Sequence, residues 1–66
     1  MRITRKILIA KVERYNSIAT VKVKLNDDVI GGINLYTENN NIIATGKYAE
    51  IALVLDALFN IKALEQ

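Results

Sequence analysis

The sequence contains no cysteine, histidine, proline or tryptophan in its 66 residues. The lack of cysteine excludes disulfides and thiolate zinc sites, and the lack of histidine removes the commonest metal ligand and the commonest general base. Nucleophile systems that pair serine or cysteine with histidine are excluded for the same reason. Phosphate-binding glycine loops, dinucleotide motifs and EF-hand loops are also missing from the sequence. We therefore expect a protein that is not an enzyme and has no catalytic residue, metal site or cofactor.

Long hydrophobic runs are missing as well. The longest is the run of five residues Ile51–Leu55, whereas a transmembrane helix needs about 20 apolar residues. The apolar stretch after the basic N-terminus is interrupted at Lys11, which makes it too short for the core of a signal peptide. Apolar residues make up 52% of the chain and charged residues 24%, a globular composition. We expect one domain over residues 1–66, in the cytoplasm and without membrane contact.

Charges are divided unequally along the chain. Residues 1–24 carry seven basic residues and one acidic residue, a net +6, whereas residues 25–66 carry two basic and six acidic residues, a net −4. Such segregation can orient a molecule toward an anionic partner. It is equally typical of a solvated strand face that a neighbouring acidic loop neutralises, so the charge pattern leaves both interpretations open.

Residues 3–25 have the alternating pattern of a β-hairpin. Leu8, Ala10 and Val12 alternate with residues that include Lys11 and Glu13. A second alternating run follows the potential turn residues Asn16–Ser17. A two-residue turn there gives a register with three apolar pairs on one face, which are Val12 with Val21, Ala10 with Val23 and Leu8 with Leu25. A shift by one residue would scatter these pairs over both faces.

The remainder of the chain predicts two more strands and a helix. The strands are expected at residues 29–37 and 42–45, and the helix at residues 47–64. Gly31–Gly32 inside the first of these strands predicts a bulge or a close backbone approach. The predicted fold class is α+β, with a small antiparallel sheet of three to four strands, in the order ββββα, packed on one C-terminal helix. In element order alone, and without a shared sequence motif, this arrangement resembles the whirly-type single-strand-binding coactivators.

The expected helix 47–64 carries apolar side chains on two nearly opposite sides. A small sheet covers only one side of a helix, and monomers avoid large exposed apolar patches. We therefore expect a homo-oligomer, a symmetric dimer by default. Its interface is predicted from the second helix stripe and from the outer hairpin face, and it comprises Ile7, Ile9, Leu53, Val54, Ile61 and Leu64.

The same hairpin face predicts a nucleic-acid interface. Cations there can contact phosphates, and Tyr15 at the hairpin tip can stack on a base, although a lone exposed tyrosine also packs well on a lysine stem. The candidate residues are Arg5, Lys11, Arg14, Tyr15, Lys22 and Lys24. The favoured function is a non-enzymatic, oligomeric binding or regulatory module whose partner is DNA or RNA.

Two other functions fit the same sequence. The first is an inhibitor or sequestering protein of the kind found in phages and mobile elements, which binds a host protein or holds an anionic nucleotide at the oligomer interface. The second is a structural subunit whose only role is assembly. A protein partner that survives nuclease treatment in a pull-down would favour the first of these over nucleic-acid binding.

Overall fold

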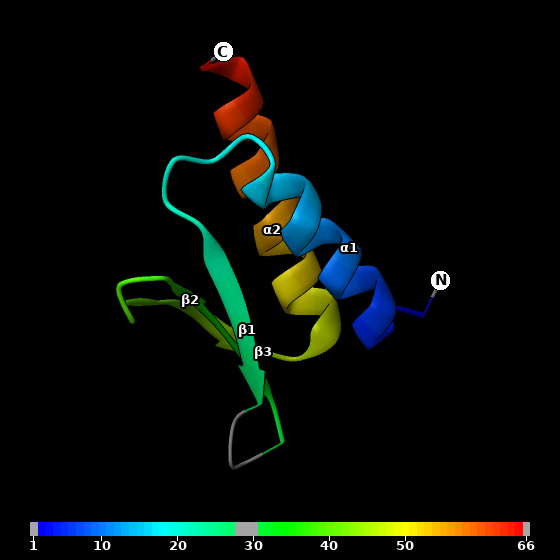
Figure 1. The fold of residues 1–66 in the computed structure, drawn as a ribbon. Helices are drawn as coiled ribbons and strands as arrows, with labels where there is room; N and C mark the ends of the chain where they lie inside the picture. Colours follow the sequence, from blue (N-terminus) through cyan, green and yellow to red (C-terminus); the bar gives the residue numbers. More distant parts are fainter. Residues whose placement is uncertain (1, 28–30, 66) are drawn as a thin grey trace.

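The computed structural model describes residues 2–27 and 31–65, and in these ranges the chain forms two helices and three strands (Figure 1). In chain order they are α1 (Arg5–Asn16), β1 (Val23–Asp27), β2 (Ile33–Thr37), β3 (Ile42–Gly46) and α2 (Tyr48–Leu64). The strands make one antiparallel sheet in the order β1-β2-β3. Helix α1 packs against α2 and β1, and α2 packs against β2 and β3, so both helices cover the same face of the sheet. The predicted α+β class is confirmed, but the ββββα order is wrong.

The predicted hairpin over residues 3–25 does not form, because its first half is helix α1. Thr4 begins the helix, and its hydroxyl accepts a hydrogen bond from the Ile7 amide at 3.3 Å. The positions Leu8, Val12 and Tyr15 then fall on one side of α1 at helical spacing and pack into the core. The resemblance in element order to the single-strand-binding coactivators is lost with the hairpin.

Asn16 ends α1 and also joins the helix to the sheet. Its side-chain amide donates to the Val23 carbonyl at 3.0 Å and accepts from the Val23 amide at 2.9 Å. Asn16 therefore acts as a strand partner for the first residue of β1 and holds the edge of the sheet under the end of the helix. The predicted turn Asn16–Ser17 is in fact a helix end, where the Ser17 amide donates to the Glu13 carbonyl at 3.0 Å.

Replacing Asn16 by alanine is expected to lower the free energy of unfolding by about 1–3 kcal/mol, because two half-buried backbone groups of Val23 lose their partners. Urea denaturation followed by circular dichroism measures this change. Ser17→Ala is the control, because it removes only an exposed hydrogen bond from the Ser17 hydroxyl to the Arg14 carbonyl, at 2.6 Å, which water can replace. A change of about 0.5 kcal/mol or less is expected there. Equal effects of the two substitutions would contradict the bridging role of Asn16.

The strand alternation places one set of side chains toward the helices and the other set away from them. The buried core consists mainly of residues on the helix-facing side of the sheet and on the two helices, namely Leu8, Val23, Ile33, Leu35, Ile51, Ala52 and Leu55. The sheet contains a bulge, but it lies in the β2–β3 pairing beside Leu35 and Tyr36 and not at Gly31–Gly32, which precede β2. The alternative prediction, a close backbone approach, holds at Gly32, where a Cβ atom would lie 3.1 Å from the Gly46 carbonyl oxygen. Of the predicted strand 29–37, residues 29 and 30 lie outside the described ranges.

Helix α2 starts one residue later than predicted and ends at the predicted residue, Leu64. The Lys47 amide at its start donates to the Glu50 carboxylate at 3.0 Å, which satisfies one of the free amides of the first turn. One side of α2 is buried in the core, whereas Leu53, Ile61 and Leu64 remain 72%, 57% and 88% exposed. Within residues 2–27 and 31–65, neither helix has the length and hydropathy needed to cross a membrane.

Candidate functional site

The structure separates the cations that the sequence predicted as one interface. Lys11 contacts both carboxylate oxygens of Asp56, at 2.8 and 3.0 Å, and the Arg14 guanidinium donates to the same carboxylate at 2.9 Å. The Arg14 guanidinium also lies 4.0 Å from the centre of the Phe59 ring, within cation–π range. These two cations therefore fasten α1 to α2, and a carboxylate already balances part of their charge.

The other predicted residues also lie apart. Arg5 pairs with Asp27 at the end of β1, and this hydrogen bond raises the pKa of the Arg5 guanidinium above its ordinary value. Tyr15 is half-buried against the core, so it does not occupy an exposed tip. Lys22 donates to the Ala19 carbonyl at 3.4 Å, and Lys24 lies on the sheet face opposite the helices. The basic hairpin face that the sequence predicted therefore does not exist in the folded chain.

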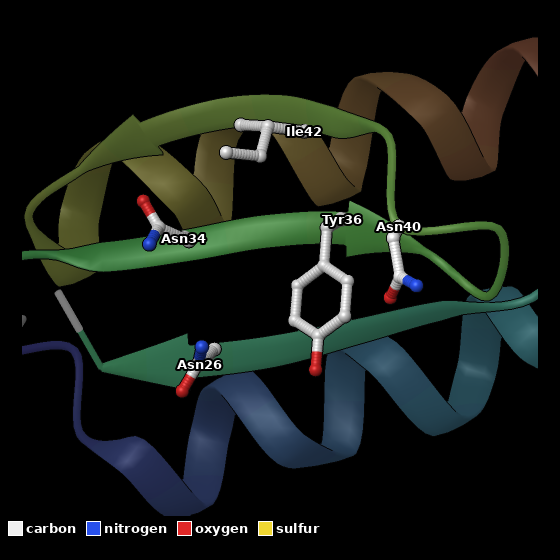
Figure 2. Close-up of a pocket in the computed structure, with 5 residues that line it drawn as sticks. All are labelled: Asn26, Asn34, Tyr36, Asn40 and Ile42. Carbon is white, nitrogen blue, oxygen red and sulfur yellow. The ribbon is translucent and has the colours of Figure 1, made fainter.

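The sheet face that neither described helix covers carries a compact group of side chains, which we call the open face. Cross-strand pairing arranges them in two rows over the three strands. The first row is Lys24, Tyr36 and Ile42, and the second is Asn26, Asn34 and Thr45. Figure 2 shows Asn26, Asn34, Tyr36 and Ile42 on the side of the sheet away from the translucent helices.

A shallow cleft lies on the open face. Its volume is about 250 Å³, and it is lined by Asn26, Asn34, Tyr36, Asn40 and Ile42. The cleft is slightly smaller than the roughly 300–1,000 Å³ that pockets for drug-sized ligands have, so it suits one flat ring better than a whole large ligand. Asn40 reaches it from the β2–β3 turn, where this residue has a φ of 65°, a conformation that asparagine tolerates better than most residues.

The polar groups of the open face retain free hydrogen-bonding capacity. Asn34 accepts a hydrogen bond from the Thr45 hydroxyl at 2.7 Å, and its NH₂ group donates to no residue in the described ranges. Lys24 has no ion pair with any residue in the described ranges. The open face thus combines an aromatic ring, amide donors and acceptors, and a lysine whose charge is not balanced by a described carboxylate.

Sequence reasoning identified Lys24 but missed Tyr36 and the asparagines. The signal was present, because Asn34 and Tyr36 alternate with the apolar Ile33 and Leu35 and must therefore share one face of a strand. What the sequence did not reveal is that both helices cover the opposite face of the sheet, which leaves this one accessible.

Comparisons with known proteins do not add to this description. No family, no curated protein and no solved structure matches the chain. The geometry and chemistry of the open face are therefore the features of this protein that bear on its function.

Proposed function

We propose that this protein is a non-enzymatic binding module that holds single-stranded nucleic acid on the open face of its sheet. The observation that carries the proposal is the row of Lys24, Tyr36 and Ile42 on the open face, beside a row of amide and hydroxyl groups. Lys24 and Ile42 are exposed, and Tyr36 between them is half-buried. Open antiparallel sheets with aromatic side chains are suited to this task, because bases stack on the rings while neighbouring cations meet the phosphates.

The arrangement favours a single strand over a duplex. A ring on the middle strand can stack only on a base whose flat face is free, and base faces in a duplex are covered by their neighbours. Neighbouring strands are about 4.8 Å apart, so Lys24 can reach the phosphate of a nucleotide whose base lies on Tyr36. Ile42, on the other side of Tyr36, provides an apolar contact for the same base or for the next sugar.

The amide row supports recognition of base edges. Asn26 and Asn34 are direct cross-strand partners next to the Tyr36 row, and an asparagine amide both donates and accepts. Unstacked bases present their hydrogen-bonding edges to such groups. The α1 cations favoured by the sequence are less suitable, since Asp27 and Asp56 already neutralise much of their charge.

Lys24→Gln is expected to weaken binding of a labelled single strand of about 16 nucleotides and to flatten the salt dependence. Losing one phosphate contact reduces the slope of log K against log salt by about 0.7. Fluorescence anisotropy titrations at several salt concentrations measure both quantities. Lys6→Gln is the control, because it removes the same charge from α1, in the helix layer. Lys6 is exposed and has no ion pair with a described residue. The slope of log K against log salt should therefore stay at the wild-type value in this variant.

Two results would contradict the open face as the site. One is an equal change of slope in the Lys24 and Lys6 variants, which would indicate a diffuse charge effect. The other is equal affinity for the single strand and for a duplex of the same sequence. A mononucleotide that binds as tightly as the oligonucleotide would support sequestration of a small anionic ligand instead.

We further propose that the protein acts as a homo-oligomer. The exposed apolar side chains of α2 support this, because contiguous apolar surface on a small domain marks an interaction site.

A further inference from the structure

Helix α2 has an apolar surface that nothing in the described chain covers, which we call the outer face of α2. It consists of Leu53, Ala57, Ile61 and Leu64, which are all exposed and follow one another at intervals of three or four residues. Of the other residues predicted for an oligomer interface, Val54 packs partly against the core and Ile7 is half-buried. Ile9 is 44% exposed but lies on α1.

The outer face points away from both neighbours of α2. Asp56 and Phe59 are turned toward α1, where Arg14 contacts them both, and Ile51 and Leu55 are fully buried in the core. Successive residues of a helix are rotated by about 100°, which places Leu53 and the rest of the outer face on the side opposite Leu55. Figure 1 shows the last turn of α2, in red, projecting past α1 and the sheet.

We propose that a second copy of this chain covers the outer face, with the two α2 helices antiparallel about a two-fold axis near Ala57. Such an interface is self-complementary, since each copy contributes the same patch. Leu53 and Ile61 lie four residues before and after Ala57, so the axis sets Leu53 against Ile61 of the partner subunit. The small Ala57 side chains at the crossing let the two helices approach closely, while the larger side chains interlock on both sides.

Charges at the two ends of α2 favour the antiparallel orientation. Lys47 at the N-terminal end is exposed and has no ion pair with a described residue. Glu65 at the C-terminal end is exposed and has a surface ion pair with Lys62 of its own helix at 3.3 Å, a type of pair that contributes little and leaves the carboxylate open to a second cation. At a rise of about 1.5 Å per residue, Lys47 lies about 15 Å and Glu65 about 12 Å from Ala57 along the helix. Lys47 therefore comes close to Glu65 of the partner subunit. The dipoles of the two antiparallel helices also point in opposite directions, which is favourable.

The surface area of the chain fits a small dimer interface. The accessible surface is 4581 Å², whereas a folded monomer of this mass, 7.4 kDa, is expected to expose about 4,200 Å². This excess of about 400 Å² is summed over the whole surface and not over the outer face alone, and it is half of the roughly 800 Å² that each partner buries in an interface of standard size. We accordingly expect a reversible dimer that forms in the micromolar range.

The solution mass tests the proposal, which rests on the proposed homo-oligomer but not on nucleic-acid binding. Sedimentation of the wild-type chain over a concentration series into the high micromolar range should approach twice 7.4 kDa. Leu53→Glu should raise the dimer dissociation constant about tenfold or more, because it places a charge in the apolar contact. Ile42→Glu is the matched control: Ile42 is 65% exposed but lies on the open face, so this variant should dimerise normally.

A charge exchange gives a second, milder test. Lys47→Glu should weaken the dimer, and adding Glu65→Lys to the same chain should restore it; circular dichroism establishes that every variant is folded. A wild-type mass of one chain at all concentrations would overturn the dimer, as would dimerisation of Leu53→Glu at the wild-type affinity. If the wild-type chain is a monomer but binds the oligonucleotide, only the dimer proposal is rejected. If it is a dimer but does not bind the oligonucleotide, only the open-face proposal is rejected.

Discussion

Tyr36→Ala is expected to reduce the affinity for single-stranded oligonucleotide about 5- to 150-fold. Stacking of one base on an aromatic side chain contributes about 1–3 kcal/mol, and Tyr36 is the aromatic residue on the open face. The effect should be the same for oligonucleotides of different sequence, because every base has a flat face to stack. Anisotropy titration at constant, stated salt concentration gives the ratio of dissociation constants, which is needed since affinity for nucleic acid changes steeply with salt.

Tyr36→Phe is the control for this prediction. It keeps the ring and removes only the hydroxyl, so most of the wild-type affinity should remain. Because Tyr36 lies on the face away from the core, neither variant should lose the helical circular dichroism signal of the wild type. A Tyr36→Ala variant with wild-type affinity, or a Tyr36→Phe variant as weak as the alanine variant, would exclude stacking on this ring.

The C-terminal half of the fold could be predicted from the sequence, whereas the N-terminal third could not. In the second half, the turn at residues 38–41 separates two segments that fit only a strand pattern, and the run 47–64 fits only a helix pattern. In residues 5–16, two patterns coexist: Leu8, Ala10 and Val12 alternate as in a strand, and Leu8, Val12 and Tyr15 repeat as in a helix. The lack of proline and glycine in this segment and the cap at Thr4 favour the helix.

Contacts between distant residues decided which cations remain available. Lys11 and Arg14 meet Asp56, 45 and 42 positions further along the chain, and no local pattern predicts such a contact. Once α1 is a helix, its basic residues are also spread around its axis and no longer lie along a strand face. Lys24 remains a candidate because it belongs to a real strand, and the same alternation that exposes it also exposes Asn26.

Leu8→Ala is expected to lower the free energy of unfolding by about 2–5 kcal/mol, the usual cost of a cavity in a core. A domain of this length has a total stability of roughly 3–10 kcal/mol, so the substitution removes a large part of it, and all of it where the total is at the lower end of this range. Urea denaturation monitored by circular dichroism measures the loss. If Leu8→Ala is unfolded without denaturant, Leu8→Val gives a smaller loss that can still be quantified.

Ala10→Gln distinguishes the helix from the hairpin at the same segment. In a hairpin Ala10 would face the core opposite Val23, and a larger polar side chain would destabilise the fold severely. On α1, Ala10 is exposed, and glutamine is nearly as good a helix former as alanine. The expected change is therefore below about 0.5 kcal/mol. An Ala10→Gln variant as unstable as Leu8→Ala would mean that residues 5–16 pair as a strand, and Arg5 and Lys11 would then share one strand face.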